Sequence, residues 1–332
     1  MIEVALFGAG RIGRIHAANL ARQPGARLRY VADVAQAAAE EVAGQHGARA
    51  LADPQAALDD PAVGAVVIAS STDTHADLIQ RAAAAGKAIF CEKPVDLDLE
   101  RARRCAEAVK AAGVVCMVGF NRRFDPTFAA VKRRLEAGEI GESEMLIITS
   151  RDPGLPPVSY LQVSGGIFKD MLIHDFDMFR WLLGDEAETV YAAGSCLVDL
   201  AVAEVGDADS TAVTLRTRKG KLCQINTTRR AVYGYDQRFE VLGSGGMLQA
   251  GNQRPTEVSA YTGKAVSYDL PEYFFLERYR AAYALEMAHF IAALTEGTPV
   301  LTTIEDGVRA LALADAATRS WREGRPVAPA YD

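Results

Sequence analysis

The sequence predicts an α/β protein with two domains. The N-terminal domain is expected to contain a doubly wound parallel sheet, and the C-terminal α/β domain a large, mainly antiparallel, open-faced sheet. Three observations lead to this fold class. Strands and helices alternate over the first 120 residues, and a glycine-rich turn joins the first strand to the first helix. After residue 120, strand-like segments follow one another with few helices between them. We therefore expect domains at 1–120 and 121–332, with 303–332 able to pack back on the first.

The first strand leads into the strongest motif of the chain. Apolar residues 2–7 run into Gly8-Ala9-Gly10-Arg11-Ile12-Gly13, and a helix follows. In such a turn the glycines permit a tight bend, close approach of a pyrophosphate and packing of the helix on the strand. A lone GxGxxG is weak evidence, but Asp33 ends the next predicted strand, 20 residues after Gly13. This context predicts a dinucleotide-binding Rossmann domain.

Asp33 also predicts which dinucleotide binds. Its carboxylate can accept hydrogen bonds from both ribose hydroxyls and repels a 2′-phosphate. The next residues, Val34-Ala35-Gln36, supply no cation for such a phosphate. We therefore expect NAD rather than NADP.

Polar segments follow three further apolar strands of the predicted parallel sheet. Ligands bind at the carboxyl ends of such strands, so these segments are expected at the site. Lys93 could hydrogen-bond a substrate hydroxyl there, or it could be a solvated loop lysine. His75, at the start of a predicted helix, is interpreted as a packing or capping residue. The three segments are Ser70-Ser71-Thr72, Glu92-Lys93-Pro94 and Asn121-Arg122-Arg123.

An apolar segment from Gly165 to Leu183, closed by Gly184, is predicted to form one buried helix. It carries Asp170 and His174, four residues apart and therefore on one helix face. A buried carboxylate beside an imidazole can form a proton relay, or it can be a structural aspartate beside a satisfied core histidine. Asp177 shares the face and is interpreted as a structural carboxylate.

The second sheet is expected to bury one face under helices and to use its open face to oligomerise. Tyr233 and Tyr235 lie at a connection between its strands. They could line a polyol site, or they could be surface tyrosines near a turn.

Composition excludes several other classes of protein. The net charge is −7 and no basic run is present, which argues against nucleic acid and anionic membranes as partners. The first residues enter a predicted strand without a positive region or a long apolar core, so we expect no signal peptide, and no apolar run approaches the length of a membrane span. Five dispersed cysteines without a CxxC pair, and no metal-ligand cluster, predict reduced thiols in a cytoplasmic protein without a metal.

Taken together, these motifs resemble the Gfo/Idh/MocA family of NAD(P)-dependent oxidoreductases over essentially the whole chain, and most closely its inositol 2-dehydrogenase branch. The resemblance rests on the glycine turn, Cys91-Glu92-Lys93-Pro94, the run from Gly119 to Asp125 and the Asp170–His174 segment. It also rests on Arg151-Asp152-Pro153 and Tyr233-Gly234-Tyr235-Asp236.

The resemblance implies oxidation of a ring secondary alcohol by NAD, with myo-inositol giving 2-keto-myo-inositol (scyllo-inosose). Lys93 then contacts the reacting hydroxyl, Asp170 and His174 form the relay, and a homotetramer is expected. The implied cofactor contacts are Gly8, Gly10, Arg11, Ile12, Gly13, Asp33, Ser70, Ser71, Thr72, Glu92 and Lys93. The implied substrate contacts are Lys93, Arg123, Asp170, His174, Tyr233 and Tyr235.

Two alternatives stay open. One is a family member acting on scyllo-inositol, glucose or a deoxy sugar; the branch often has a histidine near the position of Ser150, so the preferred epimer is open. The other is a non-catalytic NAD-binding regulator, against which the presence of Lys93, Asp170 and His174 together argues.

Overall fold

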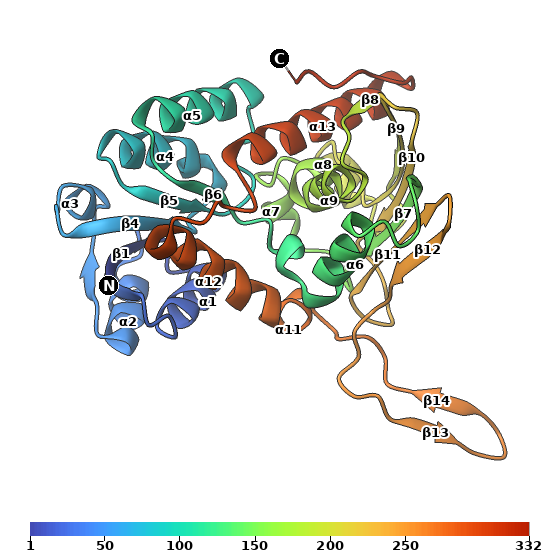
Figure 1. Cartoon of the computed structure of the whole chain (residues 1–332), viewed down its shortest axis with the longest axis horizontal. Helices are drawn as coiled ribbons and strands as arrows, with labels where there is room; N and C mark the ends of the chain where they lie inside the picture. The colour runs from blue at the N-terminus through green and yellow to red at the C-terminus, as the bar shows by residue number, and fades with distance from the viewer. Residues whose placement is uncertain (332) are drawn as a thin grey trace. The chain divides into compact units, whose positions relative to one another are not determined.

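The computed structural model describes residues 1–331, which form two compact units. The first unit comprises Met1–Phe124 and Ala281–Leu311, and the second comprises Asp125–Arg280 and the chain from Ala312 onward. Each unit contains one six-stranded sheet. Figure 1 shows the elements of both units in the order of the chain.

The sheet of the first unit is parallel throughout, as the alternation of strands and helices predicts. Its central strands are buried along nearly their whole length, which is expected where helices cover both faces. In spatial order the strands are β3 (Arg49–Leu51), β2 (Ala26–Ala32), β1 (Ile2–Phe7), β4 (Val63–Ile68), β5 (Ala88–Cys91) and β6 (Cys116–Val118).

Helices cover this sheet on both sides, with α1 and α2 on one face and α4 and α5 on the other (Figure 1). Local sequence sets several ends: the Asp98 carboxylate caps α5, and Thr303 and Asp306 form a reciprocal cap at the start of α13. The helices are α1 (Arg11–Leu20), α2 (Gln36–His46), α3 (Gln55–Leu58), α4 (His75–Ala84), α5 (Leu99–Ala112), α12 (Arg280–Glu296) and α13 (Ile304–Glu323), with 3₁₀ turns η1 (Thr72–Thr74) and η2 (Asn121–Phe124).

The sheet of the second unit is mainly antiparallel, as predicted, but β7 and β10 run parallel. Two further short strands pair only with each other. The sheet order is β12 (Gly246–Ala250), β11 (Asp236–Gly243), β7 (Ser143–Arg151), β10 (Leu222–Thr228), β9 (Ser210–Thr217) and β8 (Ala187–Ser195); β13 (Ser259–Tyr261) and β14 (Val266–Tyr268) form a separate hairpin.

One face of this second sheet is buried and the other is exposed, as the alternating burial along β9 shows. Helices α6, α8 and α9 lie on the buried side (Figure 1). The helices of this unit are α6 (Pro126–Glu136), α7 (Val158–Leu161), α8 (Ile167–Asp170), α9 (Ile173–Leu183), α10 (Ala201–Glu204), α11 (Phe275–Arg278) and the second half of α13.

The five cysteines are free thiols, and four of them are buried. Burial raises the pKa of Cys105 to about 11, and the pKa values of Cys91, Cys116 and Cys223 also lie above the ordinary range because of burial. Among residues 1–331, no helix has both the length and the apolar character needed to cross a bilayer.

Candidate active site

The glycine turn forms a close-packed loop at the start of α1. Gly8 adopts φ +101°, and a Cβ there would lie 2.5 Å from the backbone of Ala69 and Ser70. A Cβ on Gly13 would lie 1.9 Å from the Gly8 carbonyl oxygen, so the helix could not approach the strand with any other residue. By contrast, nothing lies within 4 Å of a Cβ built on Gly10, which leaves that side of the loop accessible.

The amino terminus of α1 is suited to an anion. Gly10 caps the helix without a side chain, and no acidic residue occupies the first turn. The first N–H groups of a helix lack partners within it and carry partial positive charge. The loop and helix therefore fit the pyrophosphate of a dinucleotide.

Asp33 lies directly after β2 and contacts the glycine loop. Its Oδ2 accepts a hydrogen bond from the Ala9 N–H at 2.6 Å, and its Oδ1 accepts one from the Ala35 N–H at 2.8 Å. Each carboxylate oxygen has a second lone pair, so ribose hydroxyls can still be accepted. The same residue thus orders the loop and presents its charge where a ribose is expected.

The segments after β4 and β5 are joined by His75, which is 1% exposed. Its Nδ1 lies 2.8 Å from the Pro94 carbonyl oxygen and its Nε2 lies 3.1 Å from that of Ser70. Burial lowers the pKa of the imidazole, and in its neutral form the ring donates to one of these two carbonyl oxygens at a time. His75 therefore has a positioning role between two predicted cofactor segments, consistent with the packing role inferred from the sequence.

Lys93 and its neighbours lie at this same edge of the sheet. Lys93 is half-buried, while Glu92 turns its side chain inward to His16 on α1, at 2.7 Å. In the Ser70-Ser71-Thr72 segment, the Ser70 hydroxyl lies 2.6 Å from that of Thr74. The predicted contacts of these residues with the cofactor stay predictions.

Arg123 lies in η2, after β6, and is 6% exposed. Its guanidinium donates to the Leu301 carbonyl oxygen at 2.9 Å and pairs with Asp306 at 3.0 Å. Both partners belong to the same unit, and Asp306 also caps α13. Its predicted contact with a polyol stays a prediction, and these bonds indicate that Arg123 also orders the start of α13.

In the second unit, the predicted single helix around Asp170 and His174 is wrong. The segment forms two helices, α8 and α9, which are separated at Met171 and Leu172. Asp170 ends the first and His174 lies in the first turn of the second. Gly184 ends α9 at φ +60°, as predicted. Asp177 is 1% exposed, which fits its interpretation as a structural carboxylate.

Asp170 is held by two side chains that the sequence did not single out. The Tyr160 hydroxyl donates to Oδ1 at 2.8 Å, and a guanidinium nitrogen of Arg229 lies 3.0 Å from Oδ2. Partial burial and the nearby carboxylate raise the pKa of Tyr160, so it remains a donor at neutral pH. Arg229 directly follows β10, and this position after a strand is the one signal that could have revealed it.

The two predicted tyrosines differ in environment. Tyr233 donates to Asp236 at 2.6 Å and accepts from Arg151 at 3.0 Å. Tyr235 is 7% exposed and packs edge-on against Tyr279, with ring centroids 5.9 Å apart. Tyr233 thus belongs to a polar network at the ends of β7 and β11, whereas the ring of Tyr235 belongs to the core.

A glycine loop open to an anion, an acid after the second strand and polar segments at the carboxyl edge of a parallel sheet define a dinucleotide-dependent oxidoreductase. Family models match both parts of the chain. The oxidoreductase-family model for an NAD-binding Rossmann fold matches residues 2–120, and the C-terminal alpha/beta domain model of that family matches residues 132–328. The chain belongs to the Gfo/Idh/MocA oxidoreductase family, and its first domain binds NAD.

Individual relatives span the whole chain. The inositol 2-dehydrogenase of Rhizobium meliloti (strain 1021) is 51% identical over 328 residues, covering 98% of each chain. The crystal structure of a myo-inositol dehydrogenase from Corynebacterium glutamicum has a TM-score of 0.95 and 45% identity, covering 99% of this chain and 100% of that one. The scyllo-inositol dehydrogenase of Lactobacillus casei, solved with NAD(H) and scyllo-inositol, has a TM-score of 0.93 and 26% identity, with 99% of each chain covered.

Proposed function

We propose that this protein oxidises a ring secondary alcohol of a cyclitol with NAD, and that its substrate is myo-inositol, which it converts to 2-keto-myo-inositol. The observation that carries the proposal is the 51% identity to an inositol 2-dehydrogenase along the full chain. The open glycine loop and Asp33 supply the fit for the cofactor. When bound, NAD supplies the hydride acceptor at C4 of its nicotinamide.

The proposed catalytic residues are Lys93, Asp170 and His174. His174 takes the proton of the substrate hydroxyl as a general base, and Asp170 orients the imidazole and stabilises its charged form. The Lys93 ammonium hydrogen-bonds the same hydroxyl oxygen and stabilises the alkoxide as charge develops on it. Arg229 and Tyr160 support this assignment, because their hydrogen bonds hold the Asp170 carboxylate in one orientation.

Arg123, Tyr233 and Tyr235 are proposed to complete the polyol site. Of the two tyrosines, Tyr233 is the stronger candidate, because its hydroxyl already belongs to a polar network with Arg151 and Asp236. Burial, followed by the nearby Asp236 carboxylate, raises the pKa of Tyr233, so its hydroxyl stays protonated at neutral pH.

The test is a spectrophotometric assay of NADH formation with myo-inositol, scyllo-inositol, chiro-inositol and glucose. The highest kcat/KM with myo-inositol supports the proposal. A preference for scyllo-inositol supports the second candidate, a scyllo-inositol dehydrogenase like the similar enzyme of Lactobacillus casei. Tight NAD binding without turnover of any polyol would instead identify a non-catalytic regulator.

We also propose a homotetramer that assembles through the exposed face of the second sheet. The strand register places Leu222, Met145, Leu242 and Met247 next to one another on four neighbouring strands of that face. Three of these side chains are at least 40% exposed, so they form an apolar row of the kind that marks an interface.

We also propose a cytoplasmic location, which is supported by the free, mostly buried thiols.

A further inference from the structure

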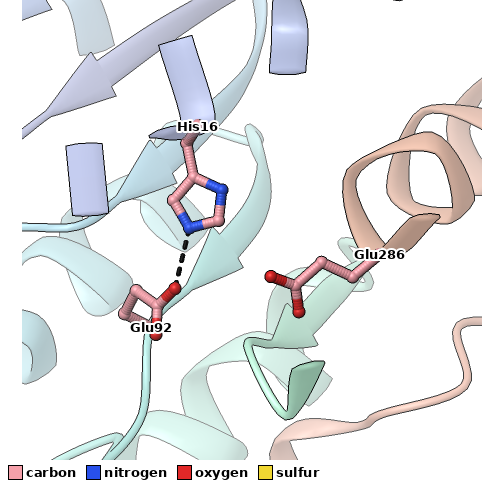
Figure 2. Close-up of side chains that lie close together, drawn as sticks. All are labelled: His16, Glu92 and Glu286. Carbon is pink, nitrogen blue, oxygen red and sulfur yellow. Dashed lines mark hydrogen bonds and ion pairs between the residues drawn. The ribbon is translucent and has the colours of Figure 1, made fainter. Parts of the chain in front are cut away.

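Three buried ionisable side chains converge in the first unit, and none of them is one of the proposed catalytic residues. They are His16 on α1, Glu92 after β5 and Glu286 on α12 (Figure 2). One nitrogen or oxygen atom from each lies within 4.8 Å of those of the other two. His16 and Glu286 are completely buried, and Glu92 is 9% exposed.

Two of the three form a well-defined pair. His16 Nε2 lies 2.7 Å from Glu92 Oε1, and the edge of the ring packs against Phe90 with centroids 4.9 Å apart. Gly119 leaves the space that the carboxyl group occupies, because a Cβ there would lie 3.1–3.2 Å from its atoms. The Glu92 side chain is therefore held in a site shaped for it.

Glu286 is the unexplained member. Its carboxyl group points toward the His16–Glu92 pair in Figure 2, yet neither of its oxygens has a hydrogen-bond partner. A buried carboxylate without a donor loses its hydration and gains nothing in return. The charge of Glu92 adds repulsion, so burial and then Glu92 raise the pKa of Glu286 well above its ordinary value.

Geometry favours a proton over a metal ion at this cluster. Ligand atoms around a tetrahedral zinc with bonds of about 2.1 Å are about 3.4 Å apart. The 2.7 Å between His16 Nε2 and Glu92 Oε1 is shorter and has the length of a hydrogen bond. One water with hydrogen bonds of about 2.8 Å can bridge two oxygens about 4.6 Å apart. An oxygen of Glu286 and an oxygen of Glu92 lie within 4.8 Å of each other, which is compatible with such a bridge.

We propose that Glu286 carries a proton in the folded protein, and that it forms with His16 and Glu92 a buried triad that positions the Glu92-Lys93-Pro94 segment. His16 lies on α1, whose amino terminus is suited to the pyrophosphate of a dinucleotide, and Glu92 directly precedes Lys93. The triad thus ties the cofactor helix to the segment that carries Lys93. The functional part of this inference rests on the proposed role of Lys93.

The first experiment tests the proton. Unfolded Glu286 loses its proton near pH 4.5, whereas the folded side chain keeps it, so stability falls as pH rises from there toward the raised folded pKa. Glu286→Gln removes this dependence. We expect the Tm of the variant minus that of the wild type to increase between pH 5 and 8, by about 2 °C or more per pH unit.

The matched control is Glu296→Gln, at the exposed end of α12, whose Tm difference should not change with pH. If the Tm of Glu286→Gln minus that of the wild type is independent of pH, or falls as pH rises, then Glu286 is not protonated in the folded protein. One equivalent of a divalent metal in the purified protein, measured by elemental analysis and lost in Glu286→Gln, also overturns the protonated state.

The second experiment tests positioning. We expect Glu286→Ala to lower kcat about tenfold or more while the KM for the cyclitol changes less than about twofold, because misplacement of Lys93 affects the transition state. Glu286→Gln should restore kcat to within about twofold of the wild type. An unchanged kcat in Glu286→Ala, or failure of Gln to restore it, rejects the positioning role.

The same design separates this inference from the proposed function. A wild-type protein that turns over no cyclitol rejects the function alone. Crystal structures of the wild type and Glu286→Ala then decide: a shift of the Lys93 Cα by about 1 Å supports positioning. An unmoved Lys93 rejects it.

Discussion

A guanidinium nitrogen of Arg229 lies 3.0 Å from a carboxylate oxygen of Asp170, and the Arg229 side chain is only 2% exposed. Asp170 therefore ends its short helix against a buried cation. Removing one partner of a buried ion pair leaves the other charge uncompensated, which is costly. The pair thus offers a way to disturb the proposed relay without touching Asp170 or His174.

Replacing Arg229 with Met should lower kcat about 10- to 100-fold and destabilise the protein by about 2–4 kcal/mol, because Asp170 loses its cation and the hydrogen bond from it. Arg229→Lys keeps the charge and should recover part of both losses. Arg230→Met, at the neighbouring exposed position, is the control. Kinetics with urea unfolding would measure both effects, and full activity in stable Arg229→Met would contradict the role of the pair.

His174→Ala should lower turnover at least about 100-fold, the usual scale for loss of a general base. His46→Ala, in the last turn of α2, is the control for removing an imidazole. The measurement is kcat from NADH absorbance, together with circular dichroism to establish folding. Near-normal turnover in folded His174→Ala rejects the relay.

Asp33→Ser should raise the KM for NAD about 10- to 100-fold, because the ribose loses charge-assisted hydrogen bonds. It should also narrow the preference for NAD over NADP, since the charge that repels a 2′-phosphate is gone. The surface variant Asp59→Ser should leave both values unchanged. Equal efficiency of the wild type with the two cofactors would refute the assignment of Asp33.

Leu242→Glu should dissociate the proposed tetramer, because it places a charge in the apolar row of the second sheet. Light scattering measures the mass in solution. Leu285→Glu, at an exposed leucine of the first unit, should leave the mass unchanged. Assembly through another surface is established if Leu242→Glu has the same mass as the wild type.

Iodoacetamide at pH 8 should label Cys196 and leave Cys91, Cys105, Cys116 and Cys223 unmodified in the folded protein. The reactive species is the thiolate, and burial raises the pKa of all five thiols, so the difference rests on access: four thiols are buried, whereas Cys196 is partly exposed. All five should react in denaturant. Mass spectrometry counts the modified residues, and rapid labelling of a buried thiol would show that its surroundings open readily.

Local sequence determined much of this protein. The glycine turn, the alternation of apolar strands with helices, and Gly184 at the end of α9 could be predicted because each depends on residues close together in the chain. The NAD-binding domain follows from the same evidence. In contrast, the break between α8 and α9 was missed, because the apolar residues of 171–183 continue the helical pattern across it.

Only the tertiary structure decided which distant side chains meet. Arg229 contacts Asp170 although the two are 59 residues apart in the sequence, and His16 contacts Glu92 although they are 76 residues apart. No spacing or periodicity encodes such pairs, because they depend on how strands and helices are ordered in space. The same holds for Glu286, whose burial and approach to the His16–Glu92 pair appear only in the tertiary structure.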